Sequence, residues 1–224
     1  MDGLRIVFDL DGTLLRSSKP DSDAFERAYL EIFCVQIGRA DVESCRHHTD
    51  LGIVNEMWER QRGRRPVDSE IAPLHDRFMA ILSDLLPHGP ALQALGASAL
   101  LDELRRRGIA TAIATGAWRA SADLKIQRAE LDAAGIPIAT CDRLESRAAI
   151  VRQAISLLPP VGGRTVLVGD GPWDVACARE LGHPFIGVDL DGADRMTRLG
   201  VESVVPDFTD LNRFLRLAER DARP

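Results

Sequence analysis

Helical periodicity and short apolar runs alternate along the sequence from Leu100 to Val188. Three glycines, Gly108, Gly135 and Gly182, stand where the C-terminal caps of helices are expected. Alternation of this kind is typical of right-handed crossovers, which build a parallel sheet with helices on both faces. The sequence therefore predicts an α/β fold with a Rossmann-like sheet. The expected strands are 109–114, 136–140, 165–168 and 185–188, and the expected helices are 99–108, 120–134, 146–158 and 173–181.

A further buried strand is expected at residues 4–8, where an apolar run stops at an Asp-Gly turn signal. This strand must join the same sheet, although a long helical stretch follows it. From residue 21 to residue 86 there is no strand pattern, and apolar side chains recur at helical spacing, as in Phe25, Ala28, Tyr29, Ile32 and Phe33. We therefore expect an α/β core of residues 1–15 and 88–224 that is interrupted by a helical insertion of residues 16–87.

Composition and charge restrict the class of protein. Hydrophobic residues make up 45% of the sequence and charged residues 28%. The sequence contains no run of about eighteen apolar residues, which is the length that a membrane span requires. The first residues lack the pattern of a secretory signal, so we expect a cytoplasmic protein. The net charge of −6 argues against a general nucleic-acid binder but allows a phosphate ligand that arrives with a divalent cation. The four cysteines are scattered and are expected to be reduced thiols.

Polar side chains follow the expected strands. Ligands of open α/β sheets bind at the carboxyl ends of the strands, so these side chains should converge at one edge of the sheet. Carboxylates gathered in this way repel one another unless a metal ion lies among them. Hard oxygen ligands suit Mg²⁺, which shares its coordination shell with substrate phosphate. The residues concerned are Asp9, Asp11, Thr13, Thr115, Gly116, Asp170 and Asp174.

Three of these segments together resemble a known family, the haloacid dehalogenase-like hydrolases. "DLDGTL" at residues 9–14, the Thr115-Gly116 pair and "GDGPWD" at residues 169–174 occur in the family's order, each after an expected strand. The resemblance covers nearly the whole chain and is strongest to the phosphoglycolate phosphatase-like branch, which has a helical cap after the first motif. It implies a Mg²⁺-dependent phosphatase that hydrolyses a small phosphomonoester through an aspartyl-phosphate intermediate.

The resemblance also implies roles for the aspartates. Asp9 would be the nucleophile that takes the phosphoryl group, and Asp11 would be the acid/base. In an extended segment, residues two apart point the same way, so the two carboxylates can face one phosphorus. Asp9, Asp11 and Asp170 would hold the metal. Thr13 would orient the Asp11 carboxylate, and Asp174 would be a metal ligand or a neighbour of one.

The phosphate-binding residues include a departure from the family pattern. Thr115 and the amide of Gly116 would hold phosphoryl oxygens. The family normally adds a lysine, but the chain has only Lys19 and Lys125. Lys125 is expected to lie too far along its helix from the strand end, at about 1.5 Å rise per residue. Arg147, which opens the helix after the third expected sheet strand, is the better-placed cation, although the sequence leaves the choice between Arg147 and Lys125 open.

Two other polar segments are expected to play no part in catalysis. A second Asp-Leu-Asp-Gly at residues 189–192 lacks the following threonine and follows the last long strand, which the resemblance places towards the sheet edge, so it is expected to be a solvated turn. Residues 47–50, two histidines followed by Thr49 and Asp50, are expected to start a helix, with Thr49 or Asp50 near its N-cap.

Rival functions remain. A phosphomutase of the β-phosphoglucomutase type would have the same core. A non-catalytic binding module of this fold would be expected to lose some of Asp9, Asp11 and Asp170, yet all three are present. Dehalogenation is disfavoured because that branch dispenses with the second aspartate, whereas Asp11 is present. Phosphonate hydrolysis through a Schiff base on a cap lysine is disfavoured because Lys19 is the only lysine near the insertion. The expected partner is a small phosphorylated metabolite, with no nucleic acid or membrane, and the protein could be a monomer or a homodimer.

Overall fold

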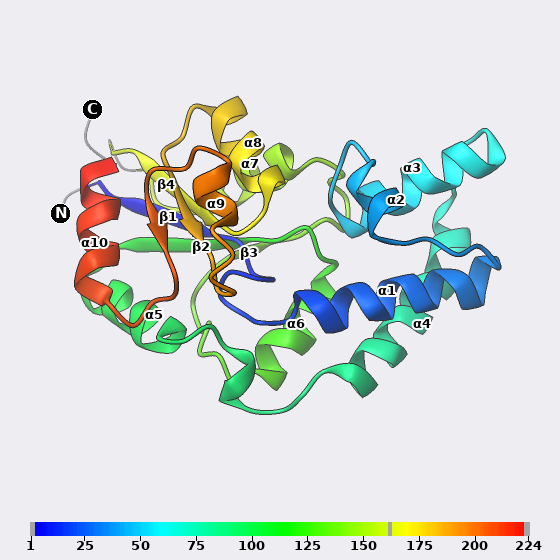
Figure 1. Cartoon of the computed structure of the whole chain (residues 1–224), viewed down its shortest axis with the longest axis horizontal. Coiled ribbons are helices and arrows are strands. Elements are labelled where there is room, and N and C mark those ends of the chain that lie inside the picture. The colour runs from blue at the N-terminus through cyan, green and yellow to red at the C-terminus, as the bar shows by residue number, and fades with distance from the viewer. Residues whose placement is uncertain (1–2, 161–162, 222–224) are drawn as a thin grey trace.

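A six-stranded parallel sheet forms the centre of the computed structural model, which describes residues 3–160 and 163–221 (Figure 1). The strand order is β3-β2-β1-β4-β5-β6, and each neighbouring pair is parallel. The α/β prediction is thus confirmed. The strands are β1 (Arg5–Phe8), β2 (Ala110–Ala114), β3 (Ile138–Ala139), β4 (Thr165–Gly169), β5 (Phe185–Val188) and β6 (Val204–Val205).

Helices cover both faces of the sheet. α7 and α8 pack side by side on one face, and α5 and α10 lie on the other (Figure 1). The second face is aromatic: the Phe8 ring of β1 stacks on Phe214 of α10 and meets Phe208 edge to face. The helices of this part are η1 (Pro90–Leu92), α5 (Ala97–Arg106), α6 (Arg119–Arg128), α7 (Arg147–Ser156), α8 (Pro172–Leu181), α9 (Arg195–Arg198) and α10 (Leu211–Asp221).

Two sequence expectations about these elements are wrong. α6 ends at Arg128 and not at residue 134, because Glu130 takes a left-handed conformation with φ of 54°. Gly135 therefore lies in a turn and does not cap this helix. At the other end of the sheet, β6 was not predicted because its two residues are too short for a periodic pattern. β5 is consequently an interior strand.

Four helices between β1 and α5 form a separate group on the side of the sheet where the strands end (Figure 1). The long helices α1 and α4 pack against each other. Phe25 of α1 contacts Phe78 of α4, and both rings contact Trp118 at the start of α6. The four helices are α1 (Ser18–Phe33), α2 (Arg39–Glu43), α3 (Asp50–Arg62) and α4 (Asp68–Leu85).

Within the described residues, no helix has both the length and the hydropathy that crossing a membrane requires. The cytoplasmic location stays a prediction.

Candidate active site

Asp9 and Asp170 lie side by side because they follow neighbouring parallel strands. β1 and β4 pair with Phe8 opposite Val168, and the Asp9 N–H extends this pairing by donating to the Val168 carbonyl at 2.8 Å. Asp170 comes directly after β4. Both side chains are buried, with 5% of Asp9 and 7% of Asp170 exposed. The sheet register thus brings two distant sequence motifs to one point.

Asp174 completes a group of three carboxylates. It lies in the first turn of α8, where its Oδ2 accepts a hydrogen bond from the Gly171 N–H at 3.0 Å. One carboxylate oxygen from each of Asp9, Asp170 and Asp174 lies within 4.8 Å of the other two. These three residues are called the carboxylate group below. Asp9 and Asp170 are two of the three predicted metal ligands, and Asp174 was expected to be a ligand or a neighbour of one. The Asp11 carboxylate instead faces Lys125.

Burial makes this group electrostatically unfavourable on its own. Desolvation raises the pKa of Asp9 well above its ordinary value, opposed by Arg147, and neighbouring carboxylates raise it further. Desolvation and the charge of Asp174 raise the pKa of Asp170 to about 7. Among the described residues, none donates a hydrogen bond to Asp9 Oδ2, which is also buried from water. An unpartnered buried oxygen next to two other carboxylates is the environment that a divalent cation would complete.

Arg147 places a buried guanidinium between two of the carboxylates. It is the first residue of α7, whose N-cap Ser146 accepts a hydrogen bond from the Ala149 N–H. Nη1 lies 2.9 Å from Asp9 Oδ1, and Nε lies 3.0 Å from Asp174 Oδ1. Both contacts are close ion pairs rather than well-aligned hydrogen bonds. Burial lowers the Arg147 pKa, but the two carboxylates outweigh this effect and the net pKa is raised, so the cation is permanent.

The turn after β2 lies next to this guanidinium. Thr115 is buried, and its Oγ1 accepts a hydrogen bond from the Ala117 N–H at 3.1 Å. Arg147 Nη1 would lie 3.3 Å from a Cβ placed on Gly116. The structure therefore brings the turn that carries Thr115 and Gly116 next to Arg147, the third predicted phosphate-binding residue, which itself contacts Asp9.

Lys125 lies in the site, so the expectation that it is too far from the strand ends is wrong. Its Nζ is 2.9 Å from Asp11 Oδ2 and also pairs with Asp21, in the first turn of α1. α6 begins only at Arg119, and helical side chains tilt towards the N-terminus, so the lysine reaches back. Burial lowers the Lys125 pKa, but Asp11 and Asp21 raise it by more. The signal missed was the spacing of Ala122, Lys125 and Ala129, which marks a buried helix face.

Thr13 also differs from expectation, because its Oγ1 donates to Asp170 Oδ1 at 3.4 Å and not to Asp11. The hydroxyl that donates to Asp11 is that of Ser17. The cause is the sharp turn at Gly12, which has a φ of 83°. A Cβ at Gly12 would come within 2.4 Å of the Asp170 carboxylate, so only glycine permits this approach of the first loop to β4.

The buried Lys125 is expected to stabilise the fold. Lys125→Met should lower the free energy of unfolding by about 3 to 5 kcal/mol, because Asp11 and Asp21 would lose their buried cation. Urea unfolding at neutral pH measures this loss, and Lys125→Met combined with Asp21→Asn should recover part of it. The other lysine provides the control: Lys19 is exposed and pairs with Asp23, so Lys19→Met should change little. Equal effects of the two single substitutions would contradict a role for the Lys125 contacts.

The segment before α3 packs onto the site from the helical group. Thr49 is the N-cap of α3, as expected, and its Oγ1 donates to the Glu145 carbonyl at 2.7 Å. The Asp50 N–H donates to the Gly116 carbonyl at 2.8 Å, and its carboxylate accepts from the Trp118 N–H at 3.0 Å. Residues 49–50 are therefore bonded to both loops that carry the predicted phosphate-binding residues.

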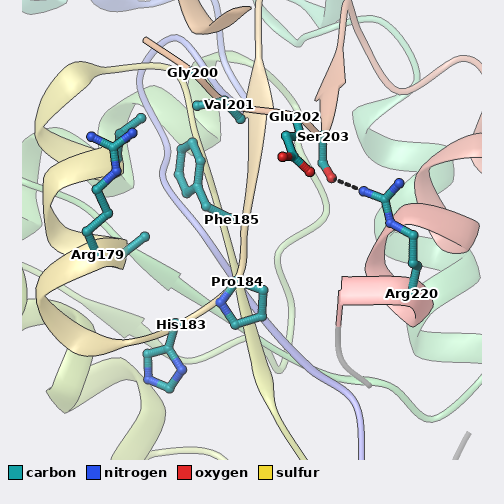
Figure 2. Close-up of a pocket in the computed structure, with 11 residues that line it drawn as sticks. Arg179, His183, Pro184, Phe185, Gly200, Val201, Glu202, Ser203 and Arg220 are labelled. Carbon is teal, nitrogen blue, oxygen red and sulfur yellow. Dashed lines mark hydrogen bonds between the residues drawn. The ribbon is translucent and has the colours of Figure 1, made fainter. Parts of the chain in front are cut away.

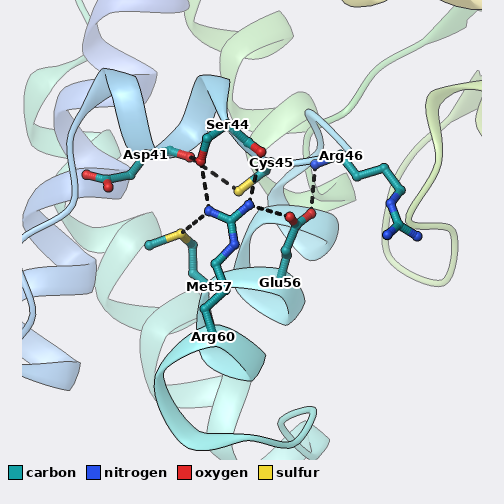
Figure 3. A network of polar contacts seen from close by, with 7 residues as sticks. All are labelled: Asp41, Ser44, Cys45, Arg46, Glu56, Met57 and Arg60. Atoms are coloured by element: carbon teal, nitrogen blue, oxygen red, sulfur yellow. Dashed lines mark hydrogen bonds and ion pairs between the residues drawn. The ribbon is translucent and has the colours of Figure 1, made fainter.

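A polar network fixes the loop that leads into this segment (Figure 3). Arg60 of α3 donates to the Ser44 hydroxyl at 2.7 Å and to the Ser44 carbonyl at 2.9 Å. Glu56 pairs with Arg60 and accepts the Arg46 N–H at 2.7 Å. His48, which follows this loop, stacks on Trp173 with ring centroids 5.0 Å apart. The loop thus meets the motif that carries Asp170 and Asp174.

The second Asp-Leu-Asp-Gly is only partly the solvated turn that was expected. Asp191 is exposed, but only 8% of Asp189 is exposed. The Asp189 N–H donates to the Val205 carbonyl at 3.0 Å, because β6 continues the sheet beyond β5. The chain then returns through α9, where Arg195 Nη2 lies 2.8 Å from Asp170 Oδ2. No motif in the sequence marks Arg195.

A cavity of about 300 Å³ lies away from these residues (Figure 2). His183 and Phe185 line it at the start of β5, with Arg179 of α8 and Arg220 of α10. Figure 2 shows Arg220 bonded to Ser203 across one wall. Because the cavity faces the amino end of β5, it lies at the opposite edge of the sheet from the carboxylate group.

Residues 6–188 match the haloacid dehalogenase-like hydrolase family, so the chain belongs to that family and the prediction of a hydrolase is confirmed. A phosphoglycolate phosphatase from Agrobacterium fabrum is 25% identical over 216 residues, which cover 93% of this chain and 91% of that protein. One from Rhodospirillum rubrum is 26% identical over 216 residues, covering 94% and 90%. A hydrolase from Pseudomonas syringae has the same fold, with a TM-score of 0.74 at 22% identity over 95% of this chain and 97% of that one.

Proposed function

We propose that this hydrolase is a Mg²⁺-dependent phosphatase that acts on a small phosphomonoester through an aspartyl-phosphate on Asp9. The observation that carries the proposal is the buried carboxylate group with its unpartnered Asp9 Oδ2, beside the Arg147 guanidinium. Anionic oxygens and a fixed cation at the carboxyl ends of β1 and β4 suit a phosphoryl group that is bridged by a metal. The relatives named phosphoglycolate phosphatase support this class of substrate.

Asp9, Asp170 and Asp174 are the residues that would hold Mg²⁺. Their buried oxygens have the hardness that Mg²⁺ prefers, and burial is the main cause of their raised pKa values because it disfavours the charged carboxylates. When bound, the ion would neutralise phosphoryl oxygens and so allow a carboxylate to approach phosphorus.

In the proposed reaction, an oxygen of the Asp9 carboxylate attacks phosphorus and the bond from phosphorus to the ester oxygen breaks. Arg147 holds Asp9 in place and neutralises phosphoryl oxygens, with help from Thr115 and the Gly116 amide. Asp11 gives a proton to the leaving oxygen. In the second half, Asp11 takes a proton from the water that attacks the phosphorus of the aspartyl-phosphate, which releases phosphate and restores Asp9.

Lys125 and Ser17 would position Asp11 for both proton transfers, since each donates to its carboxylate. The helical group would act as a cap, with domain limits at residues 16–87. Its contacts to Glu145 and Gly116 close over the phosphate-binding loops and would exclude water while the intermediate forms.

Metal removal tests the proposal. Release of phosphate from small phosphomonoesters, with phosphoglycolate among them, should stop after treatment with EDTA and return with Mg²⁺. Ca²⁺ should restore little activity because its larger and looser coordination shell misplaces the phosphoryl group. Full activity in a verified metal-free preparation would contradict the proposed site. Transfer of phosphate between positions of a sugar, without release, would point to a phosphomutase instead.

A further inference from the structure

Arg195 brings a second guanidinium to the carboxylate group, and the proposed reaction does not use it. Its Nη2 lies 2.8 Å from Asp170 Oδ2, while Asp170 Oδ1 accepts the Thr13 hydroxyl at 3.4 Å. Both Asp170 oxygens therefore already have a donor. Asp9 Oδ2, by contrast, has none among the described residues. A cation that binds the whole carboxylate group must compete for Asp170 but not for Asp9.

The segment that carries Arg195 packs on β5 through the residue that follows the arginine. After β5 the chain reverses at Asp194, whose φ of 51° is left-handed, and then forms the short helix α9. Met196 is fully buried. Its Cγ would lie 2.7 Å from a Cβ on Gly187 of β5, so this position must be glycine for α9 to sit on the strand. Met196 thus holds α9 against β5, whereas the neighbouring Arg195 side chain is partly exposed to solvent.

Exposure distinguishes the two guanidinium groups. The Arg147 side chain is 10% exposed and lies between Asp9 and Asp174, whereas the Arg195 side chain is 41% exposed. A guanidinium and a divalent cation on one carboxylate repel each other, and this repulsion is strong where water is scarce. Arg195 can relieve it by turning into solvent at low cost, and Arg147 cannot.

We propose that Arg195 is a displaceable counter-cation that competes with the divalent metal for Asp170. The proposal rests on the proposed function, which puts Mg²⁺ at the carboxylate group. Arg195 neutralises Asp170 in the metal-free protein and leaves it when Mg²⁺ binds. It therefore weakens metal affinity. In the metal-free protein it offsets the repulsion among the three buried carboxylates and so stabilises the fold.

Calorimetric titration of the metal-free protein with Mg²⁺ at fixed ionic strength tests the competition. Arg195→Gln should bind Mg²⁺ about tenfold more tightly than the unmodified protein, equivalent to about 1.4 kcal/mol. Arg195→Lys keeps the charge and should bind more weakly than Arg195→Gln. The matched control is Arg198→Gln, an exposed arginine of the same helix that bonds to the Ala193 carbonyl, and it should leave the affinity unchanged.

Thermal unfolding gives a second readout. Metal-free Arg195→Gln should melt at a lower temperature than the unmodified protein, and saturating Mg²⁺ should remove the difference because the metal then satisfies Asp170 in both proteins. An equal or weaker Mg²⁺ affinity of Arg195→Gln, or a melting difference that Mg²⁺ leaves intact, would overturn the proposed role of Arg195. Either result would leave the proposed metal site standing. Absence of Mg²⁺ binding by all of the proteins would overturn the proposed metal site, and this inference with it.

Discussion

Replacement of Asp9 by asparagine is expected to abolish phosphatase turnover, with a loss of at least about four orders of magnitude in kcat. The amide keeps the shape of the side chain but cannot attack phosphorus. Because burial raises the pKa of Asp9, a neutral side chain at this position should not unfold the protein. Steady-state release of phosphate from the purified variant measures the loss, and circular dichroism checks the fold.

The control for this substitution comes from the second Asp-Leu-Asp-Gly. Asp191 is exposed and outside the carboxylate group, so Asp191→Asn should retain full activity. Substantial turnover by the folded Asp9→Asn protein would eliminate Asp9 as the nucleophile. A large loss from Asp191→Asn would mean that the second copy contributes to the site after all.

Arg147→Ala is expected to lower kcat/KM by roughly two to four orders of magnitude. The guanidinium is a fixed cation 2.9 Å from the proposed nucleophile, and losing such a contact in a water-excluded site removes several kcal/mol of transition-state stabilisation. Its planar fork also suits the geometry of phosphoryl oxygens. Arg147→Lys should recover part of the loss, since an ammonium keeps the charge but not the fork.

Arg152→Ala is the matched control, because Arg152 belongs to the same helix and is exposed in a pair with Glu180. Kinetic constants for the three variants on one substrate settle the comparison. An Arg147→Ala enzyme that is as active as Arg152→Ala would show that another cation holds the phosphoryl group. Lys125 would then be the first candidate, since its fully buried ammonium pairs with Asp11, the other proposed catalytic carboxylate.

The sequence was sufficient to predict β1 to β5 and the meeting of Asp9 with Asp170. Strands with clear apolar runs can be recognised locally, and parallel pairing fixes which of their ends meet. The position of Arg147 could also be predicted, because a residue that opens a helix directly after a strand must lie at the same edge of the sheet. Each of these inferences depends only on residues within a few positions of a strand end.

The remaining features depend on distances that sequence spacing does not determine. Helical rise alone places Lys125 too far from the strand ends, because it leaves out the reach of the side chain back along α6. Arg195 reaches Asp170 only because a left-handed Asp194 turns the chain and Met196 packs on β5. The spacing of Ala122, Lys125 and Ala129 does mark a buried face of α6, but Arg195 has no periodic signal. β6 also lacks a periodic signal because it has only two residues, and its pairing with β5 places Asp189 away from the sheet edge that the resemblance implied.

Trapping the phosphorylated enzyme tests most directly whether Asp9 is the nucleophile. The Asp11→Asn variant suits the experiment: p-nitrophenyl phosphate needs no proton on its leaving group, while the missing base slows attack by water, so the intermediate should accumulate. Acid quench followed by mass spectrometry of the intact protein and of its peptides should show one phosphoryl group, located on Asp9. A phosphoryl group on any other residue, or continued turnover with no phosphorylated protein at any quench time, would contradict the account.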